Sequence, residues 1–302
     1  MNSSNWEAYH WNVKQLWDFL QGHSTFEGIL QDLERRGVQF EANAQSVLDG
    51  QAWLAESELE AAAIGRFVIG RCAESEDGSK EITIAHGYPS AGSGHQDAAE
   101  LYTTYFVEPL YEYIDEQLDD QRAILALLNR YKQKCEWFRR GHLYEKWKAD
   151  TRRGEHNLAR DLYEYLHDQG LEFHIEPMSA SGEVDIISAQ ESDDPLLADA
   201  KIFNPERSLG KEYLAKGVGQ IYRYTVDYNK PFGYLIIYKT CADDLRLALT
   251  NQTAAVPFLI HNNKTIFLVV IDIYPHEKSA SKRGALNPIE ISENDLISVV
   301  ED

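Results

Sequence analysis

The sequence contains few cysteines, and they lie far apart. Of 302 residues only three are cysteine, Cys72, Cys135 and Cys241, and none belongs to a CxxC pair. An odd number of cysteines cannot all pair within one chain, and three are too few to hold an iron–sulfur cluster by themselves. The cysteine content therefore favours a reducing compartment.

Long apolar runs are also absent. None approaches the ~18–20 residues that would cross a bilayer, and the first residues, MNSSNWEAYHWNV, lack the basic and apolar regions of a signal peptide. We therefore expect a cytoplasmic protein without a membrane span. Hydrophobic residues still make up 43% of the chain and aromatic residues 11%, which is typical of a globular protein and excludes a disordered one.

Positive charge is scarce. The chain has 29 Lys and Arg against 49 Asp and Glu, a net charge of −20, and such a surface repels duplex DNA, so a protein that simply coats nucleic acid is excluded. Residues 131–160 are the exception, with 9 basic residues against 4 acidic ones. This basic segment is either a solvated helix face or a local ridge that contacts phosphates, and both interpretations stay open.

Hydrophobic patterning divides the chain into two regions. Residues 1–148 are predicted to be mainly helical, with a short hairpin formed by strands at 66–71 and 81–87. A long helical stretch from about 97 to 148 follows, and Pro109 is expected to kink or divide it. We expect this N-terminal region to serve in recognition, regulation or oligomerisation.

Residues 149–302 show the pattern of an α/β domain. A helix over 157–167 precedes three strand-like segments, and a second helix over roughly 206–227 leads to a fourth strand, a short helix and a final strand. The five strand-like segments are LEFHIE, EVDIIS, PLLADAKIF, FGYLIIYK and KTIFLVVIDIY.

Two of these segments carry charged residues on one face. Because side chains alternate along a strand, Asp199 and Lys201 share a face of PLLADAKIF, and Glu183 and Asp185 share a face of EVDIIS. A charged pair in an apolar strand costs free energy unless it is ion-paired or binds a metal. If the two strands pair, Asp185 and Asp199 can hold a hard divalent cation such as Mg²⁺ through oxygen. Lys201 would then orient a water or balance charge on a phosphate.

Three short motifs in this region resemble those of the RecB-like branch of the PD-(D/E)xK nuclease superfamily. That branch has Gly-x-x-Asp, Asp-x-Lys and Gln-x-x-x-Tyr, and here GEVD at 182–185, DAK at 199–201 and QIYRY at 220–224 follow in the same order. The resemblance covers residues 150–240, approximately. It implies a restriction-endonuclease-like core over 149–302, in which helices flank a central mixed sheet, and a nuclease that depends on Mg²⁺ or Mn²⁺.

The resemblance also implies roles for individual residues. Asp185 and Asp199 would bind the metal, together with Glu155 from the preceding helix, and Lys201 would be catalytic. Gln220 and Tyr224 would support the substrate or the geometry of the site. The basic residues nearby are candidates for substrate binding: Arg152, Arg153, Lys216 and Arg223.

Each of these assignments has a structural alternative. Asp185 and Lys201 could form only an ion pair, and Gln220 and Tyr224, one helical turn apart, could cap the sheet. Glu155 could be a surface carboxylate favoured by the helix dipole. Lys216 and Arg223 could serve solubility alone.

The function expected from these residues and motifs is hydrolysis of nucleic acid, DNA more readily than RNA. By family analogy alone, it would belong to a restriction or anti-phage defence system. Cleaving both strands needs two active sites, so we expect a homodimer or higher oligomer, with a regulatory partner bound through the N-terminal region. Two alternatives stay open: a metal-independent ribonuclease that uses Arg160 and His167, and a non-catalytic module that binds nucleic acid or acts as a scaffold.

Overall fold

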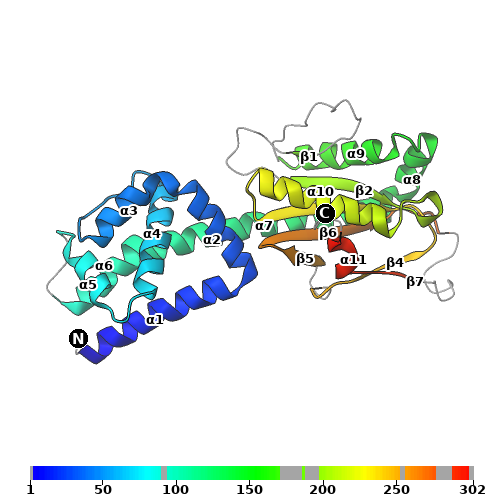
Figure 1. Ribbon diagram of the computed structural model, residues 1–302. Helices are drawn as coiled ribbons and strands as arrows, with labels where there is room; N and C mark the ends of the chain where they lie inside the picture. Colours follow the sequence, from blue (N-terminus) through cyan, green and yellow to red (C-terminus); the bar gives the residue numbers. More distant parts are fainter. Residues whose placement is uncertain are drawn as a thin grey trace. The chain divides into compact units, whose positions relative to one another are not determined.

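The computed structural model describes residues 3–89, 94–170, 186–187, 197–251, 256–276 and 288–298. The chain forms two compact units, residues 1–120 and residues 121–302. Figure 1 labels most of the helices and strands of both units.

The first unit consists of helices throughout the part that the structure describes. They are α1 (Ser3–Gly22), α2 (Ser24–Arg36), α3 (Glu41–Leu48), α4 (Glu58–Ala73), α5 (Ser79–His86) and α6 (His95–Tyr102), with a 3₁₀ turn at Val38–Phe40 and a π-helical turn at Thr103–Val107. Helix α7 (Glu108–Lys134) begins in this unit and ends in the second. Helix α4 contacts α1, α2, α3 and the π-helical turn, and its residues include Ala62, Ile64, Val68 and Ile69 of the core.

The hairpin predicted for this unit is wrong, because residues 66–71 lie inside α4 and residues 81–86 lie in α5. Helix α4 begins with the strong helix formers ELEAAA, and the Ser57 hydroxyl caps it by accepting a hydrogen bond from the Glu60 backbone N–H. Since α4 is buried on most sides, its apolar residues occur in a run that looks like a buried strand.

The helical stretch continues through Pro109, and only its type changes beside this residue, from a π-helical turn to the α-helix α7. Pro109 lies in the first turn of α7, directly after the π-helical turn Thr103–Val107. Proline lacks a backbone N–H, and its ring crowds the carbonyl four residues earlier.

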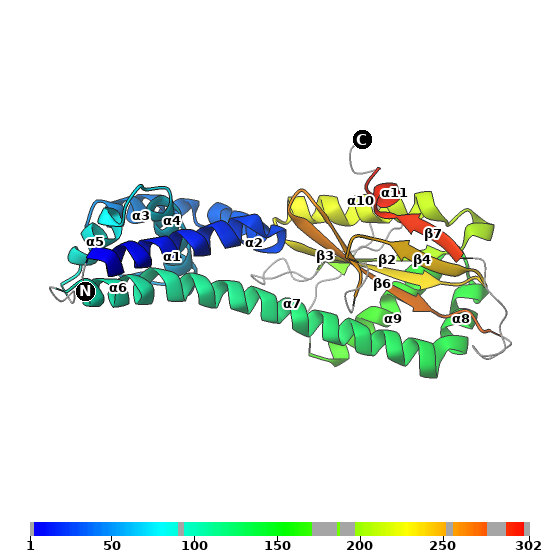
Figure 2. The same cartoon turned by 90° about the horizontal axis from the view of Figure 1, so that it is seen from below.

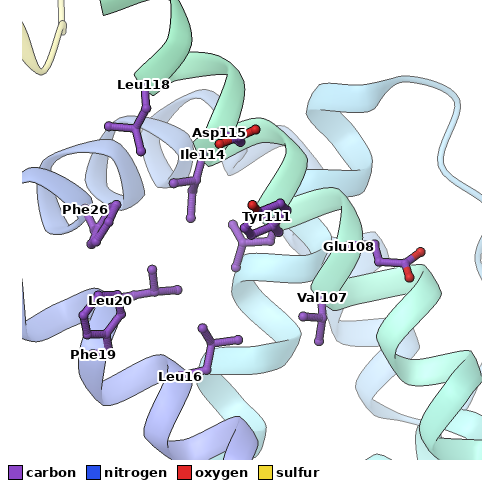
Figure 3. A pocket seen from close by; sticks show the side chains of 11 residues that line it. Leu16, Phe19, Leu20, Phe26, Val107, Glu108, Tyr111, Ile114, Asp115 and Leu118 are labelled. Atoms are coloured by element: carbon purple, nitrogen blue, oxygen red, sulfur yellow. The ribbon is translucent and has the colours of Figure 1, made fainter. Parts of the chain in front are cut away.

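The first unit contains an apolar cavity of about 420 Å³ between α1, α2 and α7. Figure 3 shows Phe19, Leu20, Phe26 and Ile114 around it, with the carboxylates of Glu108 and Asp115 among the lining side chains. Phe19 remains 59% exposed, so apolar surface of this unit meets solvent at the cavity.

The second unit is α/β, with a mixed sheet whose strand order is β1-β2-β3-β6-β5 among the described residues. The strands are β1 (Ile186–Ile187), β2 (Leu197–Phe203), β3 (Phe232–Lys239), β6 (Lys264–Asp272) and β5 (Phe258–His261). The central strands β2, β3 and β6 are parallel, while β1 and β5 are antiparallel to their neighbours. The predicted strands at PLLADAKIF, FGYLIIYK and KTIFLVVIDIY are confirmed. LEFHIE lies outside the described residues, as does EVDIIS apart from Ile186 and Ile187.

The short helix predicted before the last strand is wrong for the described residues. Strands β4 (Asp244–Ala248) and β5 occupy that part of the chain, and β4 pairs in parallel with β7 (Pro288–Ser292). Since the partner of β4 lies far along the chain, local sequence gives little sign of this pairing.

Helices cover both faces of the sheet (Figure 2). One face packs on α8 (Arg140–Ala149), α9 (Gly154–Asp168) and the end of α7, through a core that includes Ala198, Ala200 and Ile202. The other face packs on α10 (Lys211–Asp227) and α11 (Glu293–Ile297), through a core that includes Leu214, Val218 and Leu235. No described helix is both long and apolar enough to cross a membrane.

The boundary between the units differs from the one predicted at 148/149. The compact units divide between Asp120 and Gln121. The reason is packing: Leu128, Tyr131 and Trp147 belong to the core beneath the sheet, and therefore to the second unit.

Candidate active site

Strand β2 carries two charged residues, although all seven of its residues are buried. Ala198, Ala200 and Ile202 belong to the core on the α9 side, whereas Phe203 belongs to the core on the α10 side. Side chains alternate along a strand, so Asp199 and Lys201 share the α10 side with Phe203. The shared face predicted for this charged pair is therefore present.

Lys201 is ion-paired with two carboxylates from different elements. Its Nζ lies 2.9 Å from Asp199 Oδ2 and 3.5 Å from Glu155 Oε1. Asp199 is 2% exposed and Lys201 5%. Burying these charges is costly unless opposite charges meet, and here one ammonium group meets two carboxylates.

Glu155 is held beside strand β2 by three hydrogen bonds. The Ile202 backbone N–H donates a hydrogen bond to Glu155 Oε2 at 3.1 Å, and the Tyr213 hydroxyl donates to the same carboxylate at 2.7 and 2.9 Å. Among the described residues β1 pairs only with Leu197 and Ala198, which leaves the Ile202 N–H to Glu155. The carboxylate is therefore oriented by fixed donors and is not a freely solvated surface group.

A close contact between Gly154 and Trp147 fixes where α9 begins. A Cβ on Gly154 would lie 2.4 Å from Cδ1 of Trp147, which is buried in the core. Only glycine allows this approach, and Glu155 follows it in the first turn of α9. The Arg207 guanidinium lies 5.0 Å from the centroid of the Trp147 ring. Through its contact with Gly154, Trp147 thus helps to position Glu155.

Helix α10 approaches Lys201 closely at Gly217. A Cβ at this position would lie 2.8 Å from Lys201 Cγ and 3.2 Å from Leu235 Cδ1. The absence of a side chain there makes room for the aliphatic part of Lys201.

Gln220 and Tyr224 lie on the same face of α10 as Gly217. Gln220 Nε2 donates a hydrogen bond to the Tyr224 hydroxyl at 2.9 Å. Tyr213, Gly217, Gln220 and Tyr224 are spaced by four, three and four residues, which places them on one face of a helix. Because Tyr213 contacts Glu155 and Gly217 adjoins Lys201, this face of α10 is the one that borders the charged cluster.

Comparisons with known proteins add nothing to this geometry. No family model, no curated protein and no solved structure matches the chain. Any functional assignment must therefore rest on the three short motifs and on the contacts of the site.

The predicted basic residues are exposed rather than part of the buried cluster. Arg152 and Arg153 lie in the turn before α9, where Asp150 Oδ1 accepts hydrogen bonds from both of their backbone N–H groups. Lys216 and Arg223 are exposed on α10. These exposed side chains can reach a ligand. Their exposure would be the same if they served only to keep the protein soluble.

Two histidines of α9 lie near these residues in sequence. Burial, with a further contribution from Arg153 and Arg160, lowers the pKa of His156, so that the imidazole beside Glu155 stays neutral at neutral pH. His167 and Arg160, the pair considered for a ribonuclease, are both exposed, and Arg160 forms an ion pair with Glu164 at 3.3 Å. Nothing in these contacts favours that alternative over the cluster at Lys201.

Two carboxylates lie beside Lys201, and both are ion-paired with it. Asp199 and Glu155 offer carboxylate oxygens, the ligands that Mg²⁺ prefers. Within the described residues no group of three or more His, Cys, Asp or Glu side chains is placed to hold a metal. Asp185, the other predicted ligand, lies outside the described residues, together with Gly182 and Glu183.

Sequence reasoning missed three residues that shape the site: Trp147, Tyr213 and Gly217. Tyr213 and Gly217 could have been found from the sequence. They precede Gln220 and Tyr224 at helical spacing and therefore lie on the same face of the helix. Trp147 gave no comparable signal.

Proposed function

We propose that the protein is a metal-dependent nuclease that hydrolyses phosphodiester bonds in nucleic acid, with DNA as the first candidate substrate. The observation that carries the proposal is the meeting of Glu155, from α9, and Asp199, from β2, at the buried ammonium group of Lys201. The PD-(D/E)xK resemblance assigns metal binding and catalysis to these three residues. They come from two separate elements, and the resemblance expects them in one site.

The chain's own groups would divide the chemistry among them. A Mg²⁺ ion held by Asp199 and Glu155, with Asp185 as the further ligand, would supply Lewis-acid polarisation of the phosphodiester and a bound water of lowered pKa. Lys201 would orient the attacking water or balance the charge that grows on the phosphate. Tyr213 and the Ile202 N–H hold the Glu155 carboxylate in a fixed orientation.

The register of β1 also supports the proposal. Ile186 is paired with Ala198, the neighbour of Asp199. Asp185 precedes Ile186 in the sequence, although Asp185 itself is outside the described residues. Thiol chemistry finds no comparable support, because all three cysteines are buried.

The test is digestion of plasmid DNA and of RNA with Mg²⁺, Mn²⁺ or EDTA. We expect cleavage that requires the metal and falls by on the order of 100-fold or more in each of Glu155→Gln, Asp199→Asn and Lys201→Met. The matched control is Lys264→Met. Lys264 is a lysine of the same sheet that is 6% exposed, and its Nζ donates to the Lys230 carbonyl at 2.9 Å.

The control variant should keep its activity, since Lys264 lies at the start of β6 and its ammonium group donates a hydrogen bond to the Lys230 carbonyl. Cleavage that survives both EDTA and Lys201→Met would overturn the proposal. Binding of nucleic acid without any cleavage, unchanged in Lys201→Met, would instead identify a non-catalytic module.

Three further parts of the proposal depend on this activity. Two active sites are needed to cut a duplex, so a homodimer or higher oligomer is proposed. The first unit would serve in recognition or bind a regulatory partner. A role in restriction or anti-phage defence is proposed by family analogy alone.

A further inference from the structure

Two consecutive aromatic side chains are almost fully exposed on the second unit. Trp137 is 73% exposed and Phe138 is 81% exposed. Both belong to the π-helical turn Cys135–Arg139, which lies between α7 and α8. Large adjacent apolar groups on a surface commonly mark a binding site.

The other side of the same turn is anchored in the core. Cys135 is completely buried, and the Arg139 guanidinium donates two hydrogen bonds to the Asp161 carboxylate of α9, at 2.6 and 2.9 Å. With these two residues held inward, Trp137 and Phe138 face solvent. Their exposure therefore follows from a fixed backbone rather than from a loose loop.

The aromatic pair lies in the most basic part of the chain. Residues 131–160 hold 9 Lys and Arg against 4 Asp and Glu, whereas the whole chain has a net charge of −20. Three basic side chains are exposed before and after the pair in the same helical run: Arg130, Lys134 and Lys148. Glu145 is an exposed acidic neighbour, while the carboxylate of Glu136 is ion-paired with Lys132.

We propose that Trp137, Phe138 and these basic side chains form a platform that binds single-stranded nucleic acid. Aromatic rings stack on unpaired bases, and Lys or Arg side chains contact the phosphates between them. A duplex offers phosphates to the basic side chains, but its bases are stacked inside. It would therefore leave the two aromatic rings without a partner. The role of the platform as the substrate surface of a nuclease rests on the proposed function. Its binding of single strands does not depend on that function.

The platform leads along the chain towards the charged cluster. Helix α8 follows the aromatic pair and has 10 residues, so it spans about 15 Å at about 1.5 Å per residue. Its end is followed by the exposed Arg152 and Arg153 and then by Glu155. Figure 1 shows α8 beside the start of α9. Single-strand binding sites commonly cover about 4–16 nucleotides, and such a strand is long enough to follow this path.

The test measures binding separately from cleavage. The full-length protein in EDTA is titrated into fluorescein-labelled oligothymidylate of about 15 nucleotides, into the matching oligouridylate and into a duplex of the DNA strand, with fluorescence anisotropy as readout. We expect the single strands to bind more tightly than the duplex. The DNA and RNA strands distinguish the two sources of single-stranded nucleic acid.

Substitution of the platform should weaken this binding. We expect the double variant Trp137→Ala/Phe138→Ala to lose about ten-fold or more in affinity for the single strands. We expect Lys134→Ala to reduce the slope of log affinity against log salt by about 0.7. Trp11→Ala is the matched control, since Trp11 is an exposed aromatic residue (57%) of the first unit, and it should bind as the unaltered protein does.

Two results would overturn the inference: no binding of single strands by the unaltered protein, or equal binding by the double variant. If the double variant also dissociates in sedimentation while its binding is unchanged, the aromatic pair is an interface between copies of this chain. If the platform binds single strands but no metal produces cleavage, the inference stands and the proposed nuclease function fails.

Discussion

The position of Lys201 depends on a small neighbour that leaves room for its side chain and on two carboxylates that compensate its charge. Gly217 leaves space for the side chain, and Asp199 and Glu155 neutralise its charge. The proposed site is thus sensitive to steric changes on α10 as well as to loss of charge.

Substitution of Gly217 by alanine tests this steric requirement. The new Cβ would lie 2.8 Å from Lys201 Cγ, so Lys201 or the helix must shift. We expect overpacking to lower the free energy of unfolding by about 1–3 kcal/mol, and displacement of the ammonium group to lower cleavage by about 10- to 100-fold. Chemical denaturation and the digestion assay measure the two effects.

Gly141→Ala is the control for that experiment. Gly141 lies in helix α8, and a Cβ there would have no atom within 4 Å. Because alanine favours a helix more than glycine does, this variant should gain up to about 1 kcal/mol and keep its activity. Equal behaviour of the two variants would show that the close approach at Gly217 has no influence on Lys201.

At the scale of elements, a buried polar network joins α9, which carries Glu155, to its neighbours. The Asp161 carboxylate accepts hydrogen bonds from Arg139 and from the Tyr131 hydroxyl, which is 2.9 Å from the Tyr238 hydroxyl. Burial raises the pKa of Tyr131 and of Tyr238 well above the usual value, so both remain neutral hydrogen-bonding groups. The network connects α7, α9 and β3 beneath the sheet.

Removing the charge of Asp161 should loosen α9. In Asp161→Asn, Arg139 keeps its place but loses its ionic partner, and we expect the free energy of unfolding to fall by about 3 kcal/mol. Since Glu155 lies on the same helix, cleavage should also fall in the folded variant. Urea denaturation gives the first quantity, and the digestion assay, run well below the melting temperature, gives the second.

Another ion pair of α9 provides the comparison. Arg160 and Glu164 are both largely exposed, and exposed pairs one helical turn apart contribute only about 0.3–0.5 kcal/mol. Glu164→Gln should therefore change stability by less than about 0.5 kcal/mol. An Asp161→Asn variant as stable as Glu164→Gln would mean that the buried network contributes nothing.

At the scale of the whole molecule, charge is divided unequally between the units. Residues 1–120 carry 6 Lys and Arg against 22 Asp and Glu, whereas residues 121–302 carry 23 against 27. The acidic first unit repels phosphates, so it should limit non-specific binding of nucleic acid.

A fragment of residues 121–302 tests this effect. We expect it to fold and to bind the labelled single strand more tightly than the full chain at low salt, with a difference that shrinks as salt screens the charge. Anisotropy titrations at several salt concentrations measure both. Equal affinity at low salt would contradict the expectation.

A shorter fragment, residues 149–302, shows why the boundary matters. It lacks Leu128, Tyr131 and Trp147, all of which are buried in the core beneath the sheet. Loss of several such side chains at about 2–5 kcal/mol each exceeds the stability of most domains. We expect this fragment to lack a cooperative thermal transition.

Much of the fold could be predicted from local pattern. The strands at 197–203, 232–239 and 264–272 are short, mainly apolar segments, and the helix at 211–227 has a clear apolar face, so their types follow from residues close together in sequence. Where burial on all sides removes the helical pattern, as in α4, the same reasoning fails. It also fails for β4, which pairs with a strand distant in sequence.

By itself the sequence determined that Asp199 and Lys201 share one face of a buried strand, since side-chain alternation is a local property. Only the tertiary structure decided that Glu155 joins them. Its position depends on Trp147 packing against Gly154, on the Ile202 N–H of β2 and on Tyr213 from the opposite helix layer. Those contacts join residues from separate elements of the chain, and no local pattern encodes which of them will meet.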